Sequence, residues 1–410
     1  MTAWLNIIGI GEDGVSGLSS AARAALSEAE ILLGGDRHHD LAGVTKAKRL
    51  SWPSPFDAMI DAIIAHRGRR MVVLATGDPL WYSVGARIAT AIPPREIIFH
   101  PQISAFQWAA CRMGWSLADV ETLTAHGRPA EQIVPYFWPG ARLLILTAGA
   151  ETPGQIARLL NNRGYGASQL SVLANLGGPN EGRLDGRAED WAATTPEIAP
   201  FHTLAVTCQG DQPQLLPHTP GLPDDAFEHD GKMTKQDVRA ATLAKLMPQR
   251  GEVLWDIGVG CGSVAIEWMR AAPSAAAIGF DTHTKRLAIA GRNAKVLGTP
   301  ALSLVEGEAP QILDAIPAPI GTRPDLRNPN AVFIGGGLSE ELVDCVLARL
   351  RPFGRLVANA VTLESEACLA MLQAKHGGQL TRIATAHAVP VGPYRGWRAA
   401  MPVTQWSLIR

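Results

Sequence analysis

The sequence predicts an α/β protein with two domains, and three observations support this prediction. Short aliphatic and β-branched runs alternate with helical patterns along most of the chain, as they do in sheets covered by helices. The chain has 410 residues, whereas a single domain usually holds about 100 to 200. Its composition, 47% hydrophobic and 18% charged, provides apolar side chains for two cores and argues against disorder.

The first half of the chain shows the alternation clearly. Helices are expected at residues 20–29, from Ser54 and from about Ser83. Ser54 is a favourable N-cap residue, and Pro55 suits the first position of a helix. Strands are expected at residues 5–10, 30–33, 71–75, 97–99, 142–147, 170–173 and 203–207.

A break in this pattern marks the domain boundary. Between about Cys208 and Lys232, glycine and proline interrupt any regular element. Such a composition is typical of the exposed linkers that separate domains. The sequence therefore predicts a first domain at residues 1–210, a linker at 211–232 and a second domain at 233–410.

The second half alternates strands and helices more regularly, which predicts a doubly wound parallel sheet. Helices are expected at residues 234–246, 263–270 and 284–297, and from a Ser339 N-cap, with Gly298 closing the third of them. Strands are expected at residues 253–257, 277–280, 302–306, 331–334 and 355–359. The proline-rich segment 317–329 is expected to be an inserted surface loop.

A glycine-rich loop, Gly258-x-Gly260-x-Gly262, lies between an expected strand and an expected helix. Glycines let the backbone approach a ligand closely, and a helix N-terminus offers free amides. A dinucleotide site is the alternative, but its glycines follow the spacing G-x-G-x-x-G and hold a pyrophosphate. Asp256, just before the loop, would repel a pyrophosphate and suit a cationic sulfonium. The loop therefore favours S-adenosylmethionine (SAM).

Three further motifs follow the next strands in order. Asp281 ends the second expected strand, where a carboxylate can accept hydrogen bonds from ribose hydroxyls; its alternative role is a helix N-cap. Residues 306–309 end the third strand and would flank an adenine. Residues 334–337, with three glycines, would leave room for a substrate beside the methyl donor. Each motif alone could be a turn, but their order favours a SAM-dependent methyltransferase.

Composition and charge exclude other classes. A formal net charge of −1 provides no positive field for nucleic acid, so a small-molecule substrate is favoured. The N-terminal apolar stretch ends at Ile10, and no later run reaches about 18 apolar residues, which predicts a cytoplasmic, non-membrane protein. The five cysteines are scattered without clustered histidines, so no metal site is expected.

The first half also contains ligand-type turns. Gly9 and Gly11 allow a tight exit from the first strand, Gly77 and Pro79 shape a turn, and Asp78 places a carboxylate at a strand end. Residues 7–11, 77–81, 101–106 and 126–128 together resemble the tetrapyrrole methylase family, although the loop at 11–14 departs from its usual proline and glycine. The resemblance implies a SAM site between two α/β subdomains, with Gly9, Gly77, Asp78, Trp81, Ser104 and Ala105 as contacts.

From residue 222 to residue 410 the sequence resembles the decarboxylating precorrin methyltransferases of cobalamin biosynthesis, which methylate C15. The resemblance rests on residues 223–227, 233–239, 256–263, 306–310 and 333–337. The insertion at 317–329 departs from the shorter family pattern. By resemblance, this domain has a Rossmann-like class I methyltransferase fold, and its SAM contacts are Thr234, Gly258, Val259, Gly260, Cys261, Gly262, Asp281, Glu308 and Ala309.

The two resemblances combined imply a bifunctional enzyme of corrin synthesis. It would methylate precorrin-6Y at C5 with its first domain and at C15 with its second, and remove the C12 acetate carboxyl to give precorrin-8X. Both families also imply a homo-oligomer, a dimer or a tetramer. In the alternative interpretation, the first domain is a non-catalytic module that binds the tetrapyrrole.

A tetrapyrrole with many carboxylates requires basic side chains around its binding site. Arg395 and Arg398, in an expected loop at residues 392–398, are the first candidates, although both would also suit a solvated surface loop. Lys235 and Arg239 are the next candidates.

Overall fold

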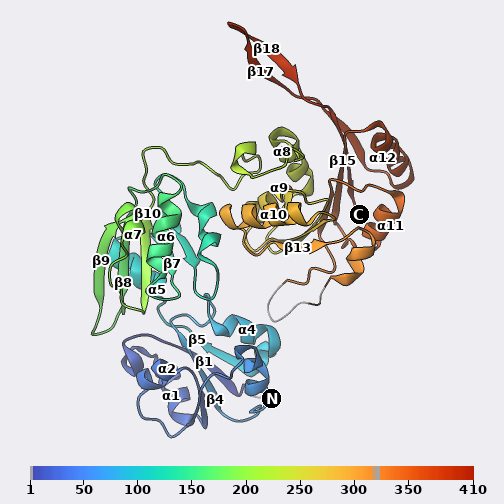
Figure 1. Cartoon of the computed structure of the whole chain (residues 1–410). Helices are drawn as coiled ribbons and strands as arrows, with labels where there is room; N and C mark the ends of the chain where they lie inside the picture. Colours follow the sequence, from blue (N-terminus) through green and yellow to red (C-terminus); the bar gives the residue numbers. More distant parts are fainter. Residues whose placement is uncertain (1–2, 317, 319–323) are drawn as a thin grey trace. The chain divides into compact units, whose positions relative to one another are not determined.

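A computed structural model describes residues 3–316, 318 and 324–410 (Figure 1). The chain forms two compact units, Met1–Gln214 and Leu215–Arg410. No helix within the described ranges has both the length and the apolar character needed to cross a membrane.

The first unit begins with a parallel sheet in the order β3-β2-β4-β1-β5. Apolar side chains fill both of its faces, with helices α3 and α4 on one side and α1 on the other. Because the strands are parallel, the loops that follow β1, β2, β4 and β5 all leave the same edge. The elements are β1 (Leu5–Ile10), α1 (Ser20–Glu28), β2 (Ile31–Leu33), α2 (Asp36–Leu41), β3 (Lys48–Leu50), α3 (Met59–Ile64), β4 (Met71–Thr76), α4 (Val84–Ala91) and β5 (Ile97–His100).

A mixed sheet in the order β6-β7-β10-β8-β9 completes this unit. Helices α6 and α7 cover one face and α5 covers the other. The carboxyl ends of β6, β7 and β8 share one edge, because β6 and β7 are parallel and β10 runs antiparallel to both β7 and β8. The elements are α5 (Ala105–Met113), β6 (Glu121–Thr124), β7 (Arg142–Leu146), α6 (Thr152–Asn161), β8 (Gln169–Ala174), β9 (Gly182–Arg187), α7 (Ala188–Ala193) and β10 (His202–Thr207).

The second unit is built on seven strands in the order β13-β12-β11-β14-β15-β19-β16. The first five are parallel, and β19 is antiparallel to both its neighbours, so the expected parallel sheet is mixed at one side. Helices α8, α9 and α10 cover one face, and α11 and α12 cover the other. The elements are α8 (Gln236–Leu246), β11 (Val253–Ile257), α9 (Ser263–Ala271), β12 (Ala276–Asp281), α10 (Thr284–Val296), β13 (Ser303–Glu306), β14 (Ala331–Ile334), α11 (Glu340–Arg349), β15 (Arg355–Ala360), α12 (Leu363–His376), β16 (Gln379–Ile383) and β19 (Val403–Ile409).

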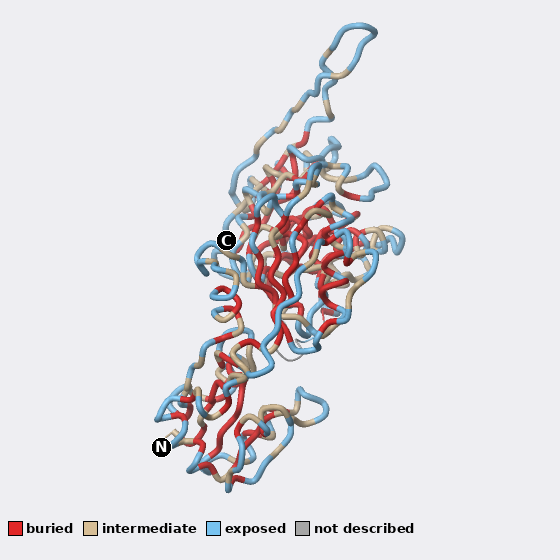
Figure 2. Tube along the Cα trace, turned by 90° about the vertical axis from the view of Figure 1, so that its left-hand side faces the viewer, coloured by how far each residue is buried: buried red, intermediate tan, exposed pale blue. Residues whose placement is uncertain are grey.

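A two-stranded hairpin projects from the second unit (Figure 1). Strands β17 (Ala386–Val391) and β18 (Tyr394–Ala399) pair only with each other. Nearly all of their residues are exposed, as the pale blue projecting loop in Figure 2 shows. The predicted loop at 392–398 is therefore a turn followed by a strand.

Most predicted elements are present, but the helix predicted to begin with a Ser54 cap is not formed as expected. Pro55 is extended, a short 3-10 turn spans Phe56–Ala58 without a side-chain cap, and α3 starts at Met59. An extended proline cannot begin an α-helix, so the first turn is displaced along the chain. Of the expected insertion at 317–329, residues 317 and 319–323 lie outside the described residues.

Candidate active sites

The glycine loop of the second unit lies where β11 and β14 diverge, which is the switch point of the sheet and the usual ligand position in such folds. The Gly335 amide donates to the Ile257 carbonyl at 2.8 Å. A Cβ atom at Gly258 would lie 2.8 Å from the Gly336 nitrogen, so a side chain there would collide with the neighbouring loop. Gly258, Gly260 and Gly262 all have positive φ angles, which glycine adopts at little cost.

Asp281, at the carboxyl end of β12, holds the glycine loop through a hydrogen bond. Its Oδ2 atom accepts a hydrogen bond from the Gly260 amide at 3.0 Å, and Oδ1 accepts one from the His283 amide at 2.9 Å. The residue is 7% exposed. An ionised carboxylate has more lone pairs than these two bonds use, so Asp281 can still accept from ligand hydroxyls.

Asp256 has a different environment from the one that the sequence suggested. It is 1% exposed, and its Oδ2 atom accepts from the Ala265 amide at the start of α9, at 3.0 Å. Its Oδ1 atom has no hydrogen-bond partner among the described residues. Burial raises the pKa of Asp256 to about 7. The carboxyl is therefore partly protonated at neutral pH, and its charge alone does not select between a sulfonium and a pyrophosphate.

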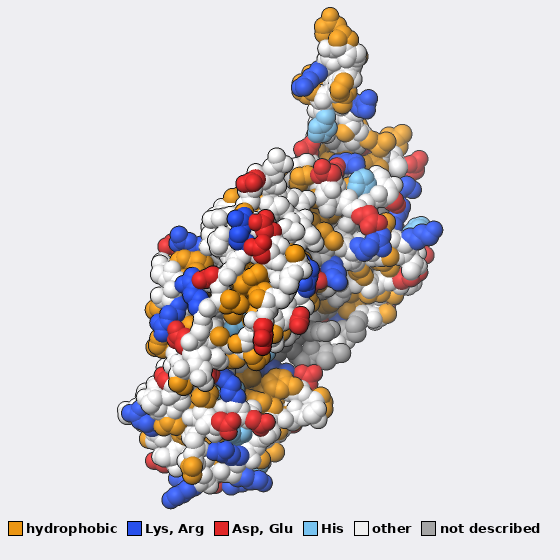
Figure 3. Space-filling model, turned by 60° about the vertical axis from the view of Figure 1, so that its left-hand side comes forward, with side chains coloured by type: hydrophobic (Ala, Val, Ile, Leu, Met, Phe, Trp, Pro, Cys, Tyr) orange, Lys and Arg blue, Asp and Glu red, His pale blue; other side chains and the backbone are white. Residues whose placement is uncertain are grey.

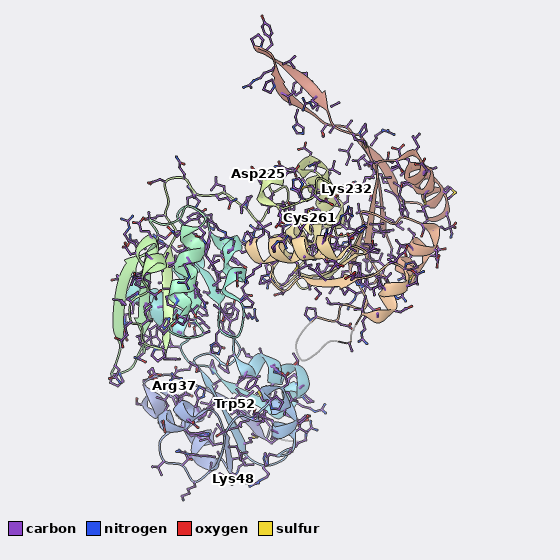
Figure 4. The ribbon with its side chains drawn as sticks, in the orientation of Figure 1. Arg37, Lys48, Trp52, Asp225, Lys232 and Cys261 are labelled. Carbon is purple, nitrogen blue, oxygen red and sulfur yellow. The ribbon has the colours of Figure 1, made fainter. Side chains whose placement is uncertain are left out.

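The segment before α8 lies against the glycine loop. The Lys232 carbonyl oxygen is 3.7 Å from a Cβ built on Gly260, and Figure 4 shows Lys232 close to Cys261. Asp230 accepts from Nε of Arg286 on α10 at 2.9 Å, which ties the segment to the domain. Thr234 follows directly and reaches Arg239 through its carbonyl. The structure thus brings Thr234 and the glycine loop into one neighbourhood.

The motif after β13 joins the same region through Asp281. The Gly307 amide donates to the Asp281 carbonyl at 3.1 Å, and Glu306 accepts from the Thr284 hydroxyl at 2.8 Å. Glu308 is exposed and Ala309 is partly buried directly after this turn. Four strand ends therefore contribute to one site.

Arg239 is not available to a substrate, so its assignment as a carboxylate-binding residue is wrong. It is fully buried, and its guanidinium donates to Glu267 at 2.6 Å, to Asp224 at 3.0 Å and to the Thr234 carbonyl at 2.7 Å. Glu267 also accepts from the Leu222 amide at 3.0 Å. Arg239 holds the segment before α8 in place instead.

The other predicted basic residues lie on exposed elements. Lys235 is the N-cap residue of α8 and is 3.7 Å from Asp224. Arg395 pairs with Pro390, whereas Arg398 pairs with His387 near the base of the hairpin. Because side chains alternate along a strand, Arg395 and Arg398 point to opposite faces of the hairpin. One carboxylate cannot bind both from the same face.

The predicted residues of the first unit pack closely where β1 and β4 end. A Cβ at Gly9 would lie 1.9 Å from the Gly77 carbonyl oxygen, and one at Gly77 would lie 2.9 Å from Cα of Ser104. Ser104 caps α5, where it accepts from the Phe106 amide at 3.2 Å, and Ala105 begins that helix. The structure therefore brings these four residues together.

The loop after Gly77 presents a carboxylate and an aromatic ring. Asp78 accepts from the Leu80 amide at 2.7 Å, an Asx-type turn that fixes the loop. Trp81 is 54% exposed, and the Tyr82 hydroxyl donates to the Thr122 carbonyl of the second sheet at 2.9 Å. The loop thus joins the edges of both sheets of this unit.

Sequence reasoning missed an arginine and a histidine on the same edge. Arg37, on α2 after β2, donates to Glu12. Its guanidinium carbon lies 3.8 Å from the centre of the ring of Phe201, which directly precedes β10 of the second sheet. His38 bonds the Thr76 hydroxyl at 2.9 Å, and burial lowers its pKa to about 4, which keeps the ring neutral. Figure 4 labels Arg37 on this part of the first sheet. The signal was the run of glycines and basic residues at 34–39 after a strand.

Within the described residues, no three His, Cys, Asp or Glu side chains gather in a way that could hold a metal ion. The buried Cys261 of the glycine loop has a raised pKa because of its burial. Its thiol is therefore protonated at neutral pH, which is typical of a small packing residue.

Comparison with known proteins matches each half of the chain to a family. Residues 5–192 match the family of Tetrapyrrole (Corrin/Porphyrin) Methylases, and residues 225–410 match the Precorrin methyltransferase domain. The fold and these family matches therefore define a two-domain methyltransferase of the tetrapyrrole class. A Sinorhizobium precorrin-6Y C(5,15)-methyltransferase (decarboxylating) is 43% identical over 99% of this chain and 96% of its own. The chain belongs to the family of decarboxylating precorrin-6Y C(5,15)-methyltransferases.

Two shorter relatives each match part of the chain. A cobalt-precorrin-7 C(5)-methyltransferase of Salmonella typhimurium is 30% identical over 43% of this chain and 87% of its own. A probable cobalt-precorrin-6B C(15)-methyltransferase (decarboxylating) of Saccharolobus solfataricus is 35% identical over 36% of this chain and 72% of its own. Proteins named for only one of the two methylations therefore exist as separate, shorter chains.

Proposed function

We propose that this methyltransferase methylates precorrin-6Y at C5 and C15 and removes the C12 acetate carboxyl, giving precorrin-8X in cobalamin biosynthesis. The observation that supports this proposal best is the presence, in one chain, of two families with two different glycine-lined sites. We further propose that the enzyme acts in the cytoplasm and binds neither nucleic acid nor metal.

The division of labour follows the predicted domains. Residues 1–210 methylate C5, residues 233–410 methylate C15 and decarboxylate, and residues 211–232 link them. The two shorter relatives, each named for one position, support this division. Their names also place precorrin-6B at the C15 step and precorrin-7 at the C5 step, which supports C15 methylation first.

Each domain has residues that fit SAM. In the second unit, the amides of the glycine loop, the spare acceptor capacity of Asp281 and the close approach of Gly258 to Gly336 form a cradle that a side chain would fill. In the first unit, a comparably close backbone packing lies next to the Asp78–Trp81 loop and is formed by Gly9, Gly77 and Ser104. Bound SAM would supply an activated methyl group, so the protein need only align it with the substrate carbon.

Alignment and exclusion of water are therefore the main tasks of the chain. The rigid glycine loop fixes one wall of the site, and Asp281 holds that loop through Gly260. Residues 335–337 carry no side chains and leave space beside this wall. For the decarboxylation, the conjugated macrocycle itself accepts the electron pair of the broken C–C bond, and a proton then replaces the lost carbon dioxide, so no strong side-chain base is required.

Arg395, Arg398 and Lys235 remain our proposal for substrate carboxylates at the C15 site. The hairpin offers the two arginines on opposite faces, so each would bind a different carboxylate or a different molecule. His387, opposite Arg398, is 3.3 Å from Asp237 of α8, which places the base of the hairpin beside the segment that covers the glycine loop. Arg398, at the base of the hairpin, is accordingly nearer to the C15 site than Arg395.

We also propose that the enzyme is a homo-oligomer, a dimer or a tetramer, and that the hairpin contributes to its interface. Tyr394 and Trp397 are 78% and 79% exposed, on opposite faces. Figure 3 shows hydrophobic side chains at the tip of this projection. An isolated hairpin is marginally stable in water, so a second copy packed against it would explain its persistence.

The experiment that tests this function is mass spectrometry of the products formed from precorrin-6Y, SAM and the full chain. Two added methyl groups and one lost carbon dioxide are expected. The Asp281→Ala chain should lose C15 methylation, because the glycine loop loses its anchor and the cofactor an acceptor. Glu364→Ala, which removes an exposed carboxylate on α12, is the matched control. Full product from the Asp281→Ala chain would rule out our assignment of this site.

A second variant distinguishes the proposed function from the alternative, in which the first domain is not catalytic. Substituting Asp78 and Ser104 together should abolish C5 methylation while C15 methylation continues. If the C5 methyl still appears, the first domain is only a binding module.

A further inference from the structure

A cavity of about 490 Å³ in the first unit is not used by either site described above. It lies between the loop after β6 and helix α6. Its walls include Arg128, Glu131, Thr152, Gln155, Arg158 and Asn162. The lining therefore has two guanidinium groups and one carboxylate, together with neutral hydrogen-bonding groups.

The cavity is at the edge of the second sheet that borders the C5 site. Ala125 and Ala148, which line it, follow the carboxyl ends of β6 and β7. Phe201, just before β10 on the same edge, stacks on Arg37 of the first sheet. The edge that carries the cavity thus faces the edge from which Gly9 and Gly77 leave.

A direct contact joins the cavity to the Asp78 loop. The Arg128 guanidinium carbon lies 5.9 Å from the centre of the Tyr82 ring, and Tyr82 follows Asp78 by four residues. Tyr82 is in turn bonded to the second sheet through the Thr122 carbonyl. Arg128 therefore lies beside the segment that follows Asp78.

The two arginines are equipped to bind carboxylates. Arg128 and Arg158 are exposed, and neither takes part in an ion pair with any residue that the structure describes. A guanidinium matches a carboxylate with two parallel hydrogen bonds, and unpaired arginines in a concave polar site favour anionic ligands. Gln155 and Asn162 add neutral donors, which can bind a carboxylate without a charge of their own.

We propose that Arg128 and Arg158 bind carboxylate side chains of the tetrapyrrole while C5 is methylated. This inference rests on the proposed function and adds a substrate subsite to it. The methionine end of SAM also carries a carboxylate, so the same chemistry has a second possible source. We assign the cavity to the tetrapyrrole because its volume is in the range of small-molecule pockets and exceeds the needs of one carboxylate.

The test uses the full chain and the C15-methylated, decarboxylated intermediate as the varied substrate. In the Arg128→Ala/Arg158→Ala chain, KM for C5 methylation should rise about tenfold or more for each arginine lost, as expected for charged hydrogen bonds. The turnover number should change less. From precorrin-6Y, this chain should accumulate product with one added methyl group and one carbon dioxide lost. Arg128→Lys/Arg158→Lys should recover part of the affinity.

Two controls keep the result specific. Arg95→Ala removes an exposed arginine before β5, at the opposite end of the first sheet, and should leave KM unchanged. Calorimetric titration of SAM without tetrapyrrole should give the same Kd in wild type and double alanine variant. Because the two units have separate cores, urea unfolding of the same chain followed by circular dichroism, rather than C15 methylation, reports that the first unit is folded.

Three outcomes would overturn the inference. They are an unchanged KM in the double alanine variant, an equal rise in the Arg95→Ala chain, or a parallel loss of SAM affinity, which would assign the arginines to the cofactor. Absence of C5 methylation by the wild-type chain would instead contradict the proposed function itself.

Discussion

Two buried carboxylates beside the glycine loop of the second unit have opposite roles. Asp281 is anchored by two backbone amides and retains the capacity to accept from a ligand. Asp256 has one amide partner and one unpaired oxygen, and its pKa is raised to about 7 by burial. Asp281 therefore remains our proposal for a ligand-binding group, and we expect Asp256 to make the stability of this region depend on pH.

Asp256→Asn should remove that dependence. A folded-state pKa above the ordinary value of 3.8 stabilises the fold fully at low pH, and this contribution is lost as pH rises toward 7. At about 1.4 kcal/mol per pKa unit, the loss is on the order of 4 kcal/mol. Urea unfolding at several values between pH 4 and pH 8 should show the wild type losing stability relative to the variant. If the unfolding free energies of the two chains changed with pH in the same way, the buried environment assigned to Asp256 would be contradicted.

Arg239 makes a second prediction at this scale. Arg239→Met leaves Glu267 buried with amide donors but no cation, which should cost about 3–5 kcal/mol of unfolding free energy. Arg382→Met, which breaks the exposed pair with Glu366, should cost less than about 1 kcal/mol. Urea unfolding of both chains measures the difference. Equal unfolding midpoints would show that the buried Arg239–Glu267 pair stabilises the fold no more than the exposed pair does.

The role of a residue could be predicted from the sequence where it depends on the local backbone, and could not where it depends on a residue distant in the sequence. Gly258, Gly260 and Gly262 could be predicted because each needs a positive φ at one point of the chain. The burial of Arg239 could not, because it depends on Glu267, which is distant in sequence. Arg37 was missed for the same reason, since its partner Phe201 lies on another sheet.

Among the elements, the buried central strands were predicted, whereas the exposed strands and several helices, α5, α6 and α12 among them, were not. Strands β1, β4, β11 and β14 are almost wholly buried and mostly apolar, so they can be recognised as continuous apolar runs in the sequence. Strand β9 is an exposed edge with charged residues, and helix α2 is short and polar, so neither shows a period. Strands β17 and β18 lack an alternation because both of their faces are exposed.

The exposed hairpin makes a prediction about assembly. If a second copy covers it, Tyr394→Ser/Trp397→Ser should shift the enzyme toward the monomer, because about 150–250 Å² of apolar area is lost for each aromatic ring that was buried. Light scattering after size exclusion measures the mass. Leu363→Ser, at an equally exposed position that starts α12, is the control. A wild-type monomer, or an unchanged mass in the double variant, would argue against the interface.

At the scale of the whole molecule, the two units have separate cores and separate sheets. The four described sheets each lie within one unit, and so do the six core clusters. A substitution that closes one site should therefore leave the other site folded. This is the structural basis for expecting two activities that can be separated by single changes.

Mixing two such chains tests this independence. Gly77→Val should close the C5 site, because even a Cβ at Gly77 would lie 2.9 Å from Cα of Ser104 and its φ is positive, whereas Asp281→Ala should close the C15 site. Each chain alone should make no doubly methylated product. An equimolar mixture should make it from precorrin-6Y, since the C15-methylated intermediate released by the Gly77→Val chain is a substrate for the intact C5 site of its partner. The opposite outcome is a mixture that forms no doubly methylated product although the Gly77→Val chain forms the intermediate. In that case the intermediate passes only between the two sites of one chain or assembly. The two units would then fold independently but would not act independently.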